Sequence, residues 1–509
     1  MDFFLTEREE VVSVFKSEPR RYSLQTTRSW DFVNLLEQQG QHGFTNTNNQ
    51  QLLRKANYGK DVIVGVLDTG VWPESQSFSD EGMEPIPNSW KGICQTGVAF
   101  QPSHCNRKLI GARYYLKGYE AYYGRLNDTE DYRSPRDKDG HGTHTASTIG
   151  GRRVANISVL GGLASGIATG GAPLVRLAIY KVCWAIPNHL KLEGDTCFDE
   201  DMLAAFDDAI ADGVNVLSIS IVPSSLKPYE QDGIAIGALH AVKANIVVAC
   251  SAGNEGPSLS TVRNVAPWII TVGASSIDRV FNSPVLLGNG MKIEGQTVTP
   301  FKLDKMYQLV YAGDVEVPGT TTNSTTGQCL DGTLSPELVK GKIVLCLSGY
   351  SYNVKKDANG SPATPFHYGA GHFQPLKAED PGLVYDTTYN DYFLFLPNNS
   401  TNKFVPSPSN LNYPSLAIAK LEGIMTVNRT LTNVGSNRSS YNSTIIPPVG
   451  YSVEISPTTL DFSYLGEKKS FSITVKSEIG SRRDEYSFGW YIWSDGIHMV
   501  RSPIAVSSA

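Results

Sequence analysis

The sequence predicts an α/β domain with a mainly parallel sheet, followed by a C-terminal β-sandwich. A chain of 509 residues is too long for one ordinary hydrophobic core, so two or three domains are expected. Between about residues 60 and 280, continuous apolar runs alternate with helical patterns, which is typical of parallel strands covered on both faces. From about residue 410 to 509, alternating polar and apolar segments recur between turns, as they do in a sandwich.

The strands and helices of the first part follow from local patterns. In 199–212 apolar residues share one face, acidic residues begin the segment and Gly213 ends it, so a helix is expected. A second helix is expected over 232–244. The apolar runs that predict buried strands are 62–67, 175–182, 214–221, 246–249 and 268–272.

Composition excludes several classes of function. The chain is 40% hydrophobic and 18% charged, and no apolar run approaches the roughly 18 residues that a membrane helix needs. The net charge of -6 includes no basic block, so neither nucleic acid nor a membrane is expected as a partner. The first residues, MDFFLTEREEVVSVFKSEPRR, lack a basic segment followed by an apolar core, so no signal peptide is expected.

Two other features favour an extracellular protein. The seven cysteines fall into near pairs with Cys250 left over, which fits either short-loop disulfides or reduced buried thiols. The near pairs are Cys94/Cys105, Cys183/Cys197 and Cys329/Cys346. N-glycosylation sequons begin at Asn127, Asn156, Asn323, Asn398, Asn399, Asn428, Asn437 and Asn442.

Three local motifs in the α/β part carry candidate chemistry. Asp68 ends the first buried strand, in VLDTGVW, at the sheet edge where catalytic groups gather, although such an Asp is often only a cap. His141, in DGHGTHTAS, stands near a helix start between glycines, and a neutral imidazole there is a candidate general base. His144 lies one turn on; a two-His metal site would need a Glu that is absent, so a structural role is expected.

The third motif is CSAGNEGP at 250–257, after the strand at 246–249. Small residues there let a substrate backbone approach, and the side-chain amide of Asn254 could stabilise an oxyanion. An ordinary turn is the alternative, because Gly-Asn pairs favour turns.

In this order, Asp, His and an Asn-bearing loop on one parallel sheet resemble the subtilase family of serine proteases, and most closely its plant, cucumisin-like members. The phrases that carry the resemblance include SPRDKDGHGTHTAST, GGAPLVRLAIYKVCW, VACSAGNEGPS and NVAPWIITVGASSIDRVF. The resemblance implies the following parts: 1–25, the remnant of an inhibitory propeptide; 26–289, the N-terminal part of the catalytic domain; 290–350, a partial protease-associated β insert; 351–409, a junction and post-catalytic segment; and 410–509, a fibronectin-III-like domain.

The resemblance also implies roles for single residues. Asp68 would orient the imidazole, His141 would be the general base, and Asn254 would bind the oxyanion. No metal or other cofactor is implied. Complete relatives would cleave polypeptides, be inhibited by their own propeptide and lie outside the cell, in the plant cell wall. The residues that would flank the substrate backbone are Ser220, Ile221, Val222, Ser251, Ala252 and Gly253.

The chain departs from the family pattern at the nucleophile. The family serine stands in a Gly-Thr-Ser-Met motif, whereas Gly-Thr here continues only as GTHTAS, GTTTNS and GTLSP. KGKIVLC at 340–346 is followed almost at once by the post-catalytic TPFHYGAGH, and Val222, Pro223 and Pro397 also depart from the family. We therefore expect an inactive subtilase; the alternatives are a non-catalytic peptide- or protein-binding remnant and a truncated product of an active protease gene.

Overall fold

The computed structural model describes residues 27–35, 51–159, 162–187, 195–256, 258–282, 284–293, 305–322, 325–330, 332–346, 363–393, 408–478 and 485–509. Residues 1–25, expected from the resemblance to be a propeptide remnant, lie outside these residues. The chain divides into two compact units. The first takes its residues from 1–32, 153–169 and 275–362, and the second from 33–152, 170–274 and 363–509.

The second unit contains the predicted parallel sheet. It has six strands in the order β10-β9-β8-β1-β5-β2, and every neighbouring pair is parallel. All five predicted runs form strands, and the sheet adds β2, whose short apolar run includes Gly111 and Ala112. The strands are β1 (Ile63–Asp68), β2 (Leu109–Tyr114), β5 (Arg176–Lys181), β8 (Val216–Ile219), β9 (Val247–Ser251) and β10 (Ile270–Val272).

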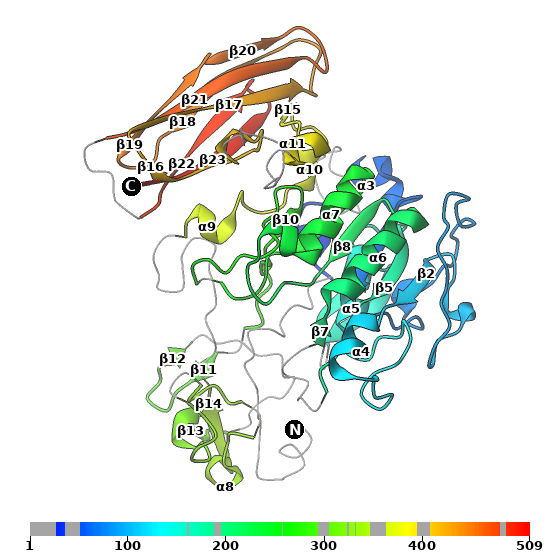
Figure 1. The fold of residues 1–509 in the computed structure, drawn as a ribbon. Helices are drawn as coiled ribbons and strands as arrows, with labels where there is room; N and C mark the ends of the chain where they lie inside the picture. Colours follow the sequence, from blue (N-terminus) through cyan, green and yellow to red (C-terminus); the bar gives the residue numbers. More distant parts are fainter. Residues whose placement is uncertain are drawn as a thin grey trace, which may run out of the picture. The chain divides into compact units, whose positions relative to one another are not determined.

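Helices pack on both faces of this sheet, as predicted, although Val247, Ile270 and Val272 of β9 and β10 stay about half exposed on one of them. Helix α6 (Asp199–Asp212) has the predicted bounds and ends at Gly213, whose φ of 91° is left-handed. Helix α7 (Gly233–Lys243) begins after Asp232, whose carboxylate accepts from the N–H groups of Ile234 and Ala235. Figure 1 shows α6 and α7 side by side over one face. Helix α5 (His141–Gly150) packs through Ala146 on the opposite face, over β1 and β5.

Short elements complete this part of the chain. They are α3 (Gln51–Lys55), α4 (Lys117–Tyr123), β6 (Cys183–Ala185), β7 (Asp195–Cys197), α9 (Pro365–Tyr368), α10 (Pro375–Glu379) and α11 (Tyr389–Phe393). Helix α11 packs against α7, and the ring of Tyr392 lies edge-on to Trp268 with centroids 5.9 Å apart. Residues 389–393 thus pack directly on the α/β core.

The described part of the first unit is built from small sheets. A small core of Ala312, Val315, Leu334 and Val339 lies around the parallel pair β13 and β14. Its elements are α2 (Ser29–Phe32), β3 (Val154–Val159), β4 (Leu163–Ala168), β11 (Val285–Leu286), β12 (Lys292–Ile293), β13 (Gln308–Tyr311), α8 (Pro336–Val339) and β14 (Lys342–Leu345).

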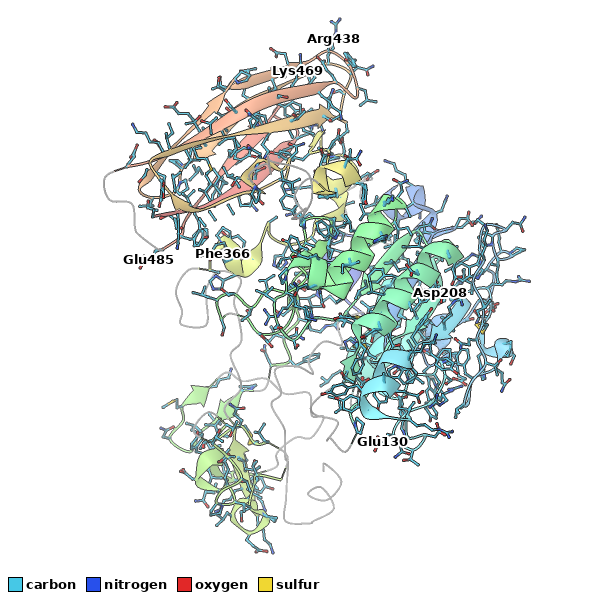
Figure 2. All side chains as sticks on the ribbon, in the orientation of Figure 1. Glu130, Asp208, Phe366, Arg438, Lys469 and Glu485 are labelled. Carbon is cyan, nitrogen blue, oxygen red and sulfur yellow. A yellow bond between two sulfur atoms is a disulfide. The ribbon has the colours of Figure 1, made fainter. Side chains whose placement is uncertain are left out.

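The C-terminal part is the predicted β-sandwich. Sheets β15-β17-β21-β19 and β16-β23-β22-β18-β20 enclose a core in which Ile473, Tyr491 and Trp493 are fully buried. Figure 2 shows Arg438 projecting outward from the margin of this sandwich. The strands are β15 (Leu383–Val384), β16 (Leu416–Leu421), β17 (Ile424–Asn433), β18 (Ser439–Ile446), β19 (Tyr451–Ser456), β20 (Thr459–Phe462), β21 (Lys468–Ser477), β22 (Ser487–Ser494) and β23 (Met499–Ser508).

The cysteines and sequons fit the extracellular interpretation. The three expected disulfides are present, which decides between the alternatives left open by spacing, and Cys250 is a buried free thiol. Every sequon asparagine in the described part is exposed: Asn127, Asn156, Asn428, Asn437 and Asn442. Asn323, Asn398 and Asn399 lie outside it. None of the described helices is long and apolar enough to cross a bilayer.

Candidate active site

The centre of the site is an acid–imidazole pair formed by residues 73 positions apart in the chain. Asp68 is the last residue of β1 and is buried, and His141 is the first residue of α5. Nδ1 of His141 lies 2.7 Å from Oδ1 of Asp68. The Thr69 N–H donates to Oδ1 at 2.8 Å and the Thr145 hydroxyl to Oδ2 at 3.0 Å. Both carboxylate oxygens are therefore engaged, and the Nε2 of His141 is the ring nitrogen left for proton transfer.

The loop before α5 is held by Asp137, a residue that sequence analysis missed. Its Oδ2 accepts from the Thr143 N–H at 2.8 Å, in the first turn of α5, and its Oδ1 accepts from the Gly140 N–H at 2.9 Å. The Thr69 hydroxyl also donates to Oδ1, at 3.0 Å. Asp137 thus fixes the helix start against the end of β1. An acidic residue just ahead of a helix start was the available signal.

Glycine is required where α5 approaches β1. A Cβ on Gly142 would lie 2.3 Å from the carbonyl oxygen of Gly70, which is closer than any real contact. Gly140, on the other side of His141, has a φ of 105° that side chains rarely adopt. The flanking glycines predicted to allow a sharp turn therefore also bring His141 to Asp68.

The charge state of His141 differs from the expected neutral imidazole. Its hydrogen bond to Asp68 raises the pKa of His141 to about 9, and nearby Asp139 and Asp137 add to this effect against the opposing effect of burial. The ring is therefore an imidazolium at neutral pH and must lose its proton before it can act as a base. Burial, and next the charge of His141, lowers the pKa of half-buried His144.

Acidic groups gather on the β5 side of this pair. Lys181, which pairs with Asp68 in the sheet, is fully buried and its Nζ lies 2.7 Å from Oδ1 of Asp131. Burial, with smaller contributions from the nearby Asp139 and Asp131, raises the pKa of Asp195 to about 7. Burial lowers the pKa of Lys181, with the charge of Asp131 opposing this effect.

The predicted substrate edge follows two neighbouring strands. Ser220, Ile221 and Val222 come directly after β8, and Ser251 ends β9 before Ala252 and Gly253. Because β1, β8 and β9 are parallel neighbours, these segments lie at the same sheet edge as Asp68. Asn254 is exposed. The hydrogen bond described between Asp68 and His141 is direct and does not involve Asn254.

Asn264 connects the two segments of this edge, and nothing in the sequence singled it out. Its Nδ2 donates to the Ile221 carbonyl at 2.9 Å and to the Ser251 carbonyl at 2.8 Å. Asn264 is buried with a left-handed φ of 53°, and its Oδ1 has no hydrogen-bond partner in the described part of the chain. A left-handed backbone and an unpaired buried oxygen both cost stability, and such features are typically retained at functional sites. Here the side chain of Asn264 fixes the spacing of two strand ends.

Comparisons with known proteins agree with this geometry. A family model described as "Subtilase family" matches residues 59–364, and one described as "Fibronectin type-III domain" matches 410–506.

Subtilisin-like protease SBT5.6 of Arabidopsis thaliana is 42% identical over an alignment of 700 residues that covers 98% of this chain and 88% of the relative. Subtilisin-like protease SBT5.5 of the same plant is 40% identical, covering 99% and 88%. Subtilisin-like serine-protease S of Lotus japonicus is 32% identical, covering 99% and 88%. With a family model matching more than half of its residues and an Asp–His pair at the carboxyl edge of a parallel sheet, the chain belongs to the subtilase family of serine proteases.

Proposed function

We propose that this chain is a subtilase that keeps the acid and base of the proteolytic site but lacks its nucleophile and does not hydrolyse peptide bonds. The observation that carries the proposal is the Asp68–His141 pair without a Gly-Thr-Ser-Met serine anywhere in the 509 residues. In the described residues the hydrogen bonds of His141 run to Asp68 and Asp139.

The lengths of the alignments support the loss of an internal segment. The alignment with SBT5.6 spans 700 residues although this chain has 509, so at least 191 positions of the relative, the difference between the two, have no counterpart here. In this chain KGKIVLC is followed by TPFHYGAGH within about twenty residues. In the family pattern a longer stretch, which includes the serine segment, lies between these two motifs.

The chemistry of the family explains why this loss abolishes hydrolysis. A serine hydroxyl attacks the scissile carbonyl, His141 takes its proton, Asp68 holds the imidazole and Asn254 binds the oxyanion. Removing the serine alone from subtilisin costs about 2 × 10⁶ in kcat. Ser218 and Ser251 lie within strands rather than at a helix start, so neither provides a substitute nucleophile.

A fluorophosphonate probe tests this proposal directly. The full chain should show no labelling and no hydrolysis of peptide substrates above its His141→Ala variant. Arabidopsis SBT5.6, treated in parallel, controls for the probe. Labelling of this chain that disappears in His141→Ala would show that a surrogate serine exists and would overturn the proposal.

A second function, binding of extended peptides without cleavage, is favoured by the Asn264 contacts. The carbonyls of Ile221 and Ser251 are held at a fixed spacing, as a channel for an extended chain requires. Val222 is 40% exposed and approaches Gly253, so Val222→Arg should block the channel. Fluorescence polarisation with a labelled casein digest should then show binding that Val222→Arg abolishes and that Val449→Arg, on an exposed sandwich loop, retains. Equal binding by both variants would argue against this function.

An extracellular location belongs to the same proposal, as does inhibition of complete relatives by their own propeptide. Three disulfides and exposed sequon asparagines suit an oxidising, glycosylating route, such as that to the plant cell wall. Residues 1–25, proposed as the remnant of an inhibitory propeptide, lie outside the described residues.

A further inference from the structure

A histidine of the sandwich lies between two carboxylates that come from different parts of the chain. His498 stands in the turn between β22 and β23, and its side chain is only 11% exposed. Its Nδ1 lies 2.8 Å from Oδ2 of Asp495, three residues earlier in the same turn. Its Nε2 lies 3.1 Å from Oδ2 of Asp380, which directly follows α10. One ring thus joins the end of α10 to the sandwich.

Asp495 and Gly382 fix the orientation of this ring. Oδ1 of Asp495 accepts from the N–H groups of Ile497 and His498 at 2.9 and 2.6 Å, so the carboxylate is built into the turn. Burial alone would raise the pKa of Asp495, but hydrogen bonds from the His498 side chain and from these N–H groups hold it at about 2. A Cβ on Gly382 would lie 2.7 Å from Cγ of His498, so the backbone packs directly against the imidazole. Asp495 therefore keeps the proton on Nδ1, and Nε2 is the ring atom that titrates.

The contact with Asp380 depends on the proton at Nε2. This nitrogen is buried and has no aligned hydrogen-bond partner in the described part of the chain, so its contact with Asp380 is an ion pair. A neutral ring would turn the Nε2 lone pair toward a carboxylate, which is repulsive. The Tyr441 hydroxyl, 3.3 Å from Nδ1, stays protonated because burial raises its pKa. Among the described residues, Asp495 of the turn, Asp380 after α10 and Tyr441 of β18 are the titratable groups that face the ring.

The end of α10 is held by charge rather than by apolar burial. Of the five residues of α10, only Pro375 is buried. Glu379 forms an ion pair with Lys55 of α3 at 2.5 Å, and Asp380 forms the pair with His498. The side chain of Asp380 is 65% exposed, so it can leave the ring for water without crossing a packed core.

We propose that His498 is a pH-sensitive latch that holds the end of α10 on the sandwich when the imidazole is protonated and releases it when the imidazole is neutral. Release stops at β15, because Leu383 is buried and pairs with Asn433 of β17. The hydrogen bond to Asp495 raises the pKa of His498 against the opposing effect of burial, and Asp380 raises it further. The latch is therefore fully closed below about pH 6.5, and it opens as the pH rises through the raised pKa of the folded chain.

Hydrogen exchange of the full chain across a pH series tests the latch, with rates corrected for the intrinsic effect of pH. Protection of the amides of residues 376–380 should fall about two- to fivefold in one titration, the range for a partly exposed ion pair. Asp380→Asn and His498→Gln should each remove this pH dependence. Asp380→Asn should also lower the pKa of His498, measured by NMR, since the coupling is reciprocal. His240→Gln, at an exposed position on α7, is the matched control and should titrate like the unchanged chain.

Three outcomes would overturn the proposal. The first is protection of residues 376–380 that stays constant across the pH series. The second is an unaltered pH dependence in Asp380→Asn, or a His498 titration that Asp380→Asn does not move, as a merely structural role would give. The third is a simultaneous and equal loss of protection in β17 and β21, which would mean that the whole sandwich opens.

Discussion

The sandwich and the α/β sheet contain similar aliphatic residues but bury them differently. Ile473 of β21 is fully buried, whereas Ile270 of β10 is 56% exposed. In the sandwich, two sheets cover each other and all their strands come from one stretch of chain after residue 382. The α/β sheet depends on helices from other parts of the chain, and the described helices leave Val247, Ile270 and Val272 of β9 and β10 about half exposed. A sheet covered by distant segments is thus more vulnerable to an internal loss than one covered by its neighbours.

The largest expected difference is between two chemically identical substitutions. Ile473→Ala should lower the free energy of unfolding of the sandwich by about 2–5 kcal/mol, because it leaves a cavity in a packed core. Ile270→Ala should change the free energy of unfolding of the α/β part by no more than about 0.5 kcal/mol, because Ile270 is already exposed. Native-state hydrogen exchange reports each region separately. Similar losses at the two positions would mean that Ile270 is covered in solution.

Reduction of the disulfides should also separate the two regions. All seven cysteines lie before residue 347, so the sandwich contains none. Each of the bridges Cys94–Cys105 and Cys183–Cys197 contributes about 3 kcal/mol in the chain-entropy model, so reductant should lower the α/β melting temperature by about 6–12 °C per bridge. The sandwich transition should not move. Free thiols at these four positions in a non-reducing peptide map would contradict the pairing.

Limited proteolysis should detect the same contrast. Cleavage within residues 60–346 should be at least about tenfold faster than within 408–509, since local opening is easier where apolar cover is incomplete. Mass spectrometry of early fragments identifies the sites. Early cuts in the sandwich, ahead of any in the sheet, would reverse the comparison.

The smallest expected effect concerns the ion pair between Asp68 and His141. His141 should titrate near pH 9 in the full chain, and Asp68→Asn should return its pKa to about 6.5. Because the folded-state pKa is raised, the stabilisation is complete below about pH 6.5 and is lost as the pH rises through 9. NMR of the imidazole protons measures the midpoint. His144→Gln serves as a control, and an unchanged midpoint in Asp68→Asn would remove Asp68 as the cause.

Much of the fold was predictable because its signals are local. The apolar runs set five of the six strands, and acidic residues with Gly213 set both ends of α6. Strand β2 was missed because Gly111 and Ala112 weaken its apolar run. The site was predictable in part: Asp68 and His141 stand in distinctive glycine-rich motifs, and Asp137 had the local signal of an acidic residue ahead of a helix start, whereas Asn264 acts through contacts that no motif encodes.

By itself, then, the sequence determined the succession of parallel strands, helices and sandwich strands, the motifs around Asp68, His141 and Asn254, and the absence of a Gly-Thr-Ser-Met segment. These properties depend on side-chain order along a few residues. Only the tertiary structure decided that His141 lies 2.7 Å from Asp68, that Asn264 joins Ile221 to Ser251, which cysteines pair, and that Val247, Ile270 and Val272 stay about half exposed. Each of these depends on where distant segments meet, because burial and hydrogen bonding between them are set by the packing of the whole sheet rather than by local periodicity.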